Sequence, residues 1–148
     1  MVNREEGKGM KGRFGHNVDA KGRLSIPAKF RAELGENFVM TRGLDGCLAL
    51  YSEDNWAKEE EKILALPNTV DSRKVQRYFF SNAMDCEFDS QGRVVIPLSL
   101  REKAGISKSV MVVGMANRAE IWDAERWNAY NEDVTDEDVV AAVERGAR

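Results

Sequence analysis

The sequence contains an internal duplication. Residues 19–35 and 89–105 align without a gap at a constant offset of 70, and seven of the 17 aligned positions are identical. Chance would supply about one identity in a stretch of this length. The identical pairs are Asp19/Asp89, Gly22/Gly92, Arg23/Arg93, Ile26/Ile96, Pro27/Pro97, Arg31/Arg101 and Gly35/Gly105. With a small change of offset the similarity reaches Trp56 and Trp127, so the chain holds two copies of a module of about 45 residues.

A module of this size buries too little surface to be stable alone. The two copies must therefore pack on each other, or each must pack on a neighbouring chain. We place the first module at residues 13–56, a helical linker at 57–82, the second module at 83–127 and an acidic tail at 128–148.

Each copy predicts the same short elements. In the first copy, strands at 13–18 and 23–26 flank a turn that starts with Asp19 and uses Gly22 where φ is positive. Pro27 ends the second strand and opens a helix over 28–34, which Gly35 terminates. The remaining strands are expected at 38–41, 47–51, 84–88, 93–96, 110–114 and 119–122, and a matching helix at 98–104. The expected fold class is α+β, mostly β.

Four further helices lie outside the repeated motif. Ser52 can cap a helix that runs to about Leu66, and a second linker helix covers about 71–81. Asp123 caps a short helix through Trp127, and Thr135 with Asp138 three residues later resembles a capping box for a last helix to Arg145. That last helix has an apolar stripe of only Val139, Val140 and Val143, which leaves its docking open.

Composition excludes several classes of protein. A single His and two distant Cys, Cys47 and Cys86, disfavour a His-based metal site, a disulfide framework and a CxxC motif. The apolar runs are too short to span a bilayer, and the N-terminus has no signal-peptide core. We therefore expect a cytoplasmic protein with no membrane partner.

The charges are unevenly distributed along the chain. The whole sequence has 22 Lys and Arg against 25 Asp and Glu, a net charge of −3 that disfavours nucleic acid. Residues 1–31, however, have eight basic and three acidic residues, while residues 131–148 have two basic and six acidic. Positive charge concentrated on one hairpin is typical of a phosphate-binding surface. Asp19 can also pair with Arg23 across the turn, a structural role that is compatible with ligand binding by the basic residues.

No set of residues predicts an enzyme. The string Gly7-Lys8-Gly9-Met10-Lys11-Gly12 matches G-x-G-x-x-G but lacks the strand and helix of a dinucleotide site. His16 could serve catalysis only with Ser25 or Cys47, and nothing in the spacing connects them. Acidic residues around the first linker helix fit a solvated face better than a metal site. We expect no catalytic residue, metal, cofactor or small-molecule substrate.

The doubled motif Asp19-Ala20-Lys21-Gly22-Arg23 and Asp89-Ser90-Gln91-Gly92-Arg93, each followed by an apolar strand, Ile-Pro and an Arg-bearing helix, resembles the MraZ family. The resemblance covers about residues 10–130, including 73–77 and 121–123. It implies two AbrB-like swapped-hairpin modules that form a small β-barrel with outer helices, and subunits that close into a ring, commonly an octamer. It also implies a nucleoid-associated regulator that binds short direct repeats in the promoter of the bacterial division and cell-wall gene cluster.

The same resemblance implies a DNA-facing role for Lys21 and Arg23, with Arg13 nearby, and for Arg93 in the second copy, while Asp19, Gly22, Asp89 and Gly92 shape the turns. Gln91 replaces the lysine, so the second copy contributes less charge. The leading hypothesis is a sequence-specific transcriptional regulator. The alternative is a ring-forming protein-interaction module that does not bind DNA.

Overall fold

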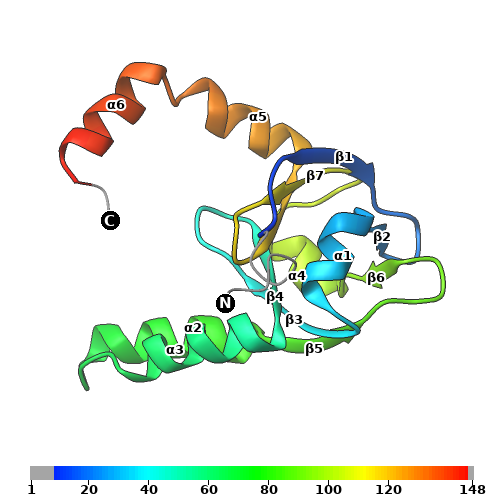
Figure 1. The fold of residues 1–148 in the computed structure, drawn as a ribbon, viewed down its shortest axis with the longest axis horizontal. Coiled ribbons are helices and arrows are strands. Elements are labelled where there is room, and N and C mark those ends of the chain that lie inside the picture. The colour runs from blue at the N-terminus through cyan, green and yellow to red at the C-terminus, as the bar shows by residue number, and fades with distance from the viewer. Residues whose placement is uncertain (1–8, 147–148) are drawn as a thin grey trace, which may run out of the picture.

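The protein is a small antiparallel β-barrel from which two helical arms project (Figure 1). The structure, a computed structural model, describes residues 9–146. Six strands form one sheet in the order β1-β7-β8-β4-β3-β5, and β2 and β6 form a separate two-stranded ribbon. The strands are β1 Arg13–Asn17, β2 Arg23–Ser25, β3 Asn37–Arg42, β4 Leu48–Ser52, β5 Met84–Glu87, β6 Arg93–Val95, β7 Ser109–Gly114 and β8 Ala119–Asp123. The α+β, mostly β prediction is confirmed.

The two copies of the repeat exchange strands. β1 of the first copy pairs with β7 of the second, and β5 of the second pairs with β3 of the first. β4 and β8, which correspond to each other in the repeat, pair at the centre of the sheet with Ala49 opposite Glu120. Within this chain the copies therefore pack on each other, one of the two arrangements that module size allows.

The β2/β6 ribbon is also built from one strand of each copy. Leu24 lies opposite Val94, and Arg23 and Ser25 lie opposite Val95 and Arg93. Just beyond the strands, Ile26 N–H donates to the carbonyl oxygen of Gly92 at 3.2 Å and Ile96 N–H donates to that of Gly22 at 2.8 Å. Equivalent residues thus exchange roles across an approximate two-fold axis between Leu24 and Val94.

One hydrophobic core holds both copies together. Its fully buried side chains come from ribbon, sheet and helices alike, because alternate residues of each strand face inward. The largest are Phe30, Phe38, Leu24, Ile26, Leu34, Met40, Leu48, Leu50, Ile96, Ile121, Val94 and Val110.

Two short helices cover the barrel at corresponding places, α1 (Ala28–Leu34) and α4 (Leu98–Lys103). Each begins directly after its proline, whose fixed φ suits a helix start. Phe30 of α1 and Leu100 of α4, which occupy equivalent positions in the repeat, are both buried in the common core.

The first arm is the linker, a hairpin of α2 (Glu53–Leu64) and α3 (Val70–Asn82). Ser52 Oγ accepts a hydrogen bond from Asn55 N–H, which confirms the predicted cap. Thr69 caps α3 in the same way, a signal that the sequence prediction missed. Thr41 Oγ1 donates to the carbonyl oxygen of Phe79 at 2.8 Å, which joins this arm to β3.

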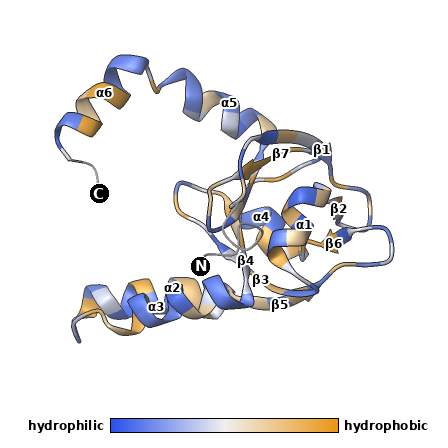
Figure 2. Cartoon of the chain, in the orientation of Figure 1, coloured by the Kyte–Doolittle hydropathy of each residue, from blue (hydrophilic) through white to orange (hydrophobic). Residues whose placement is uncertain are grey.

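The second arm consists of α5 (Ala124–Glu132) and α6 (Asp136–Glu144). α5 starts at the predicted Asp123 cap but continues past the predicted end at Trp127, because no Gly or Pro follows to interrupt it. The predicted capping box of Thr135 and Asp138 is present at the start of α6. Figure 2 shows the apolar residues of α6 on an arm that stands away from the barrel. Among residues 9–146, no helix is both long and apolar enough to cross a membrane.

Candidate nucleic-acid interface

Asp19 organises the first turn. Its Oδ1 accepts hydrogen bonds from the backbone N–H groups of Lys21 at 3.0 Å and Arg23 at 2.9 Å, and its Oδ2 accepts one from Arg23 Nε at 2.6 Å. Gly22 N–H donates to the Asp19 carbonyl oxygen at 2.9 Å, with Gly22 at φ +81°. The sequence motif is therefore a closed network in which the carboxylate fixes both the loop and the arginine.

The second turn repeats this network. Asp89 accepts from Gln91 N–H and Arg93 N–H, each at 2.9 Å, and from Arg93 Nε at 2.8 Å. In both turns the backbone N–H of the arginine is the main cause that holds the pKa of the aspartate below its ordinary value. Both carboxylates therefore stay ionised at neutral pH.

Both arginines remain available to a ligand. The Nε of each arginine donates a hydrogen bond to the aspartate, and neither arginine makes a hydrogen bond through its Nη atoms to any residue within 9–146. The side chains of Arg23 and Arg93 are 32% and 24% exposed. The aspartate thus fixes the guanidinium and leaves its outer edge, the edge that makes paired hydrogen bonds to planar acceptors, unused.

The ribbon face, which we define as Arg23, Ser25, Arg93 and Val95, points away from the core. Leu24 and Val94 are 0% and 2% exposed, so their neighbours along β2 and β6 project from the opposite side. Ser25 is exposed and Val95 is 54% exposed. The register places the two arginines at diagonal corners of this face, offset by two residues, or about 7 Å along the strands.

Lys21 and Arg13, the other two residues predicted to face DNA, lie on different parts of the surface. Lys21 and Gln91 are exposed in the two turns, next to the ribbon face. Arg13 is exposed at the far end of β1, where its surroundings include Met111 and Trp127 on a different part of the surface. The structure thus brings together Lys21, Arg23 and Arg93, and sets Arg13 apart from them.

Sequence reasoning gave no role to Arg31 and Arg101, although the repeat contains both. Arg31 Nη1 donates to the Ile26 carbonyl oxygen at 2.7 Å, and Arg101 Nε donates to that of Ile96 at 3.0 Å. Each guanidinium also lies against the turn glycine of the other copy. The sequence did contain a signal for this role, because the two arginines are identical across the offset of 70.

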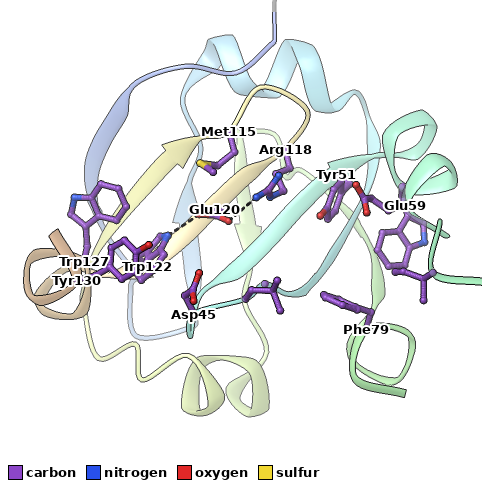
Figure 3. A pocket seen from close by; sticks show the side chains of 14 residues that line it. Asp45, Tyr51, Glu59, Phe79, Met115, Arg118, Glu120, Trp122, Trp127 and Tyr130 are labelled. Carbon is purple, nitrogen blue, oxygen red and sulfur yellow. Dashed lines mark hydrogen bonds and ion pairs between the residues drawn. The ribbon is translucent and has the colours of Figure 1, made fainter. Parts of the chain in front are cut away.

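A shallow aromatic cavity of about 410 Å³ lies on the sheet between the two arms (Figure 3). Tyr51, Trp56 and Phe79 line it on the α2–α3 side, and Trp122 and Tyr130 on the α5 side. At its floor the buried Glu120 accepts hydrogen bonds from Trp122 Nε1 at 3.1 Å and Arg118 Nη2 at 3.3 Å. Glu120 and Arg118 are thus paired with each other at the floor. Asp45 and Glu59 also line the cavity, but its other side chains are aromatic or aliphatic, so its surface is mainly apolar.

The residues considered for catalysis do not form a reactive group. Burial raises the pKa of Cys47 to about 12, and its thiol donates to the Leu44 carbonyl oxygen at 3.2 Å. Cys47 is therefore protonated at neutral pH and is a poor nucleophile. His16 is on β1 opposite Val110, while Ser25 belongs to the outward ribbon face. Residues 7 and 8 of the glycine-rich string lie outside the described residues.

Comparison with known proteins agrees with the duplication. A family model described as "MraZ protein, putative antitoxin-like" matches twice, at residues 10–78 and 79–148. A "Transcriptional regulator MraZ" from Halothermothrix orenii is 49% identical over 136 residues, covering 90% of this chain and 95% of the relative. Relatives with the same name from Heliobacterium modesticaldum and Limosilactobacillus reuteri are each 52% identical, covering 82% and 84% of this chain and 85% and 89% of their own.

Proposed function

The chain belongs to the MraZ family, and from this we propose that it is a transcriptional regulator that binds double-stranded DNA through the ribbon face and its two turns. Relatives of about 50% identity carry the name transcriptional regulator. A regulator of this kind works by binding, which is consistent with the absence of an enzyme signal in the sequence.

The observation that carries this proposal is the pair of arginines at the corners of the ribbon face. A two-stranded antiparallel ribbon fits the major groove of B-DNA, and an arginine can bind O6 and N7 of guanine with two parallel hydrogen bonds. Arg23 and Arg93 have the required Nη edges unused and are held in place by Asp19 and Asp89. Lys21 adds a compact charge suited to a phosphate.

The proposed target is a set of short direct repeats in the promoter of the division and cell-wall gene cluster, and the proposed location is the nucleoid. This target rests on the resemblance of the two Asp-x-x-x-Arg turns to the family motif. The proposed units are the modules at 13–56 and 83–127, with the linker at 57–82 and the tail at 128–148 outside the DNA surface.

The test compares Arg23→Ala and Arg93→Ala with Arg13→Ala, using fluorescently labelled DNA from upstream of this gene. Loss of one arginine–base contact is worth about 1–3 kcal/mol, so Arg23→Ala should weaken binding about tenfold to a hundredfold. Arg93→Ala should weaken it too, and Arg13→Ala should have the smallest effect because Arg13 lies away from the ribbon face. Equal binding by wild type and Arg23→Ala would refute the assignment of the site.

Self-association into a ring is the second part of the proposal. Val139, Val140 and Val143 on α6 are 51–69% exposed, and the aromatic cavity is open on the same molecule. Two different unpaired apolar surfaces on one chain favour a head-to-tail contact, which closes into a ring when the rotation allows it. A ring would present several ribbon faces to adjacent DNA repeats and raise their combined affinity.

A ring-forming module that binds only proteins is the alternative function. The same exposed valines and cavity favour it, because both are apolar surfaces unsuited to DNA. It would be supported if the purified oligomer bound neither the upstream DNA nor duplexes of random sequence at low salt, where phosphate contacts are strongest.

A further inference from the structure

The backbone of the ribbon is nearly symmetric. The pairings Arg23 with Val95 and Arg93 with Ser25 exchange under the two-fold axis between Leu24 and Val94. The bonds from Ile26 to Gly92 and from Ile96 to Gly22 exchange in the same way, as do the two aspartate networks. A DNA element that contacted only these shared features would bind equally well in either direction.

The exposed residues of the ribbon and its turns differ between the copies at three paired positions, Ala20/Ser90, Lys21/Gln91 and Ser25/Val95. The Lys21/Gln91 pair differs in charge, and the Ser25/Val95 pair differs in size and polarity. One end of the ribbon has Arg23 and Val95 paired across the strands, with Lys21 in the adjoining turn. The other end has Arg93 and Ser25, with Gln91 in the adjoining turn. The first end therefore has two cations and an apolar side chain, and the second has one cation, an amide and a hydroxyl.

Three other cations near the ribbon do not compensate for the difference in charge between its two ends. Lys29, which follows the strand at the second end, lies with its Nζ 5.6 Å from the centre of the Phe14 ring on β1. Arg31 and Arg101 face the turn glycines and donate to Ile26 and Ile96. These three cations contact other groups of the chain, and Lys21 is the exposed charge that one turn has and the other lacks.

We propose that Lys21, Ser25, Gln91 and Val95 determine the direction in which each subunit binds a DNA element. The chemistry of the two ends favours different contacts. A lysine suits a phosphate and a valine can pack on a thymine methyl group, whereas a glutamine can bind adenine N6 and N7 and a serine can bind several base edges. The inference rests on the proposed function and adds the residues that orient the chain on its target.

Two double variants remove the differences at Lys21/Gln91 and Ser25/Val95 in opposite ways, while positions 20 and 90 are the same in every protein compared. Gln91→Lys with Val95→Ser gives both ends the side chains of the first copy, and Lys21→Gln with Ser25→Val gives both ends those of the second. The first variant gains one positive charge and the second loses one. An effect that both variants share therefore comes from the symmetry of the ribbon. An effect of opposite sign in the two variants comes from the change in charge.

Direction can be read by DNA cleavage from a fixed point. Ala20, exposed in the first turn, is changed to Cys and labelled with an iron chelate that cuts nearby DNA. Cys86 is changed to Ser, and Cys47 is only 1% exposed, so the label attaches at position 20. The probe is a duplex with one binding element, isolated from random sequence by the wild-type protein.

The wild-type ribbon should cut one flank of the element about tenfold more than the other, the discrimination expected from a single base contact. Both symmetric variants should cut the two flanks equally, although Gln91→Lys/Val95→Ser binds more tightly and Lys21→Gln/Ser25→Val more weakly. One-sided cutting by either variant, or two-sided cutting by the wild-type ribbon, would overturn the inference. Failure of the wild-type protein to bind any duplex would instead overturn the proposed function, and this inference with it.

Discussion

Arg31 of the first copy lies against Gly92 of the second, so close that a Cβ atom on Gly92 would stand 2.5 Å from Arg31 Nη1. The same Nη1 donates to the Ile26 carbonyl oxygen at 2.7 Å. The reciprocal pair is looser, with a Cβ on Gly22 at 3.2 Å from Arg101 Nη2. The helix of each copy thus supports the turn of the other, and this explains why arginine and glycine recur together in the duplicated motif.

Gly92→Ala should lower the free energy of unfolding by about 2 kcal/mol. A positive φ costs a non-glycine residue about 1–2 kcal/mol, and Gly92 has φ +74°. The new methyl group would also displace the Arg31 guanidinium from its hydrogen bond with Ile26, which is worth about 1 kcal/mol. Urea unfolding followed by circular dichroism measures the loss.

The control is a double-mutant cycle with Arg31→Ala. Once the guanidinium is gone, Gly92→Ala should cost only the backbone strain, so the two substitutions together should destabilise by less than the sum of each alone. Strict additivity would show that the close contact between Arg31 and Gly92 contributes nothing to stability.

Asp19 and Asp89 should titrate below an ordinary aspartate, whose pKa is 3.8. A carboxyl with a lowered pKa in the folded protein stabilises the fold above its unfolded pKa, and this contribution disappears as the pH falls through the folded value. The stability difference between wild type and Asp89→Asn should therefore shrink as the pH is lowered past 3.8. Carboxyl carbon NMR shifts test the two pKa values directly, and ordinary titration of both groups would contradict the hydrogen-bond network.

Much of the fold was predictable from local signals. The duplication, the strand–turn–strand pattern, the helices after Pro27 and Pro97 and the Thr135 capping box all depend on residues close together in the sequence. The exchange of β1 and β5 between copies was not predictable from those residues alone. It depends on which apolar faces meet in the common core, and either copy offers equivalent partners.

The candidate site could be predicted only in part, and again from residues that lie close together in the sequence. Asp19 and Arg23 are four residues apart, so their network could be expected from spacing. Arg13 is six residues from Asp19, but an extended strand rises about 3.4 Å per residue, which carries it far from the turn. The aromatic cavity brings Trp56, at the end of the first copy, close to Trp122 of the second copy and Tyr130 of the tail, and the pairing of β4 with β8 makes this possible.

Thr41→Val should destabilise the protein by about 1 kcal/mol. The Thr41 side chain is fully buried, and its hydroxyl donates to the Phe79 carbonyl oxygen, one of the hydrogen bonds that join the linker arm to the barrel. Valine keeps the shape and removes the donor, so the cost reports the hydrogen bond. Thr41→Ser keeps the hydroxyl and should preserve the slowed amide exchange of α3, which Thr41→Val should accelerate. Unchanged stability and exchange in Thr41→Val would show that this hydrogen bond does not hold the arm, which would leave packing and the bonds from Tyr78 to Gly43 and from Asn55 to Asn117.

The salt dependence of DNA binding should follow the charge of the turns. A lysine that neutralises one phosphate contributes about −0.9 to the slope of log affinity against log salt concentration. Lys21→Gln should therefore make the slope shallower by about that amount per engaged subunit, and Gln91→Lys should make it steeper. Lys58→Gln, which changes an exposed lysine on α2, is the matched control. Equal slopes for Lys21→Gln and Lys58→Gln would place Lys21 outside the DNA surface.

Val139→Ser with Val143→Ser should weaken self-association. Both valines are more than half exposed, and none of the residues of α6 is buried within the described chain. An isolated helix of nine residues is marginal in water, so α6 needs a surface to pack on, and the aromatic cavity of a second copy can supply it. Light scattering should show a smaller assembly than wild type, while Leu98→Ser, which removes an equally exposed apolar residue from α4, should leave the mass unchanged. An unchanged mass in the double-valine variant would show that these valines do not lie in the contact between copies.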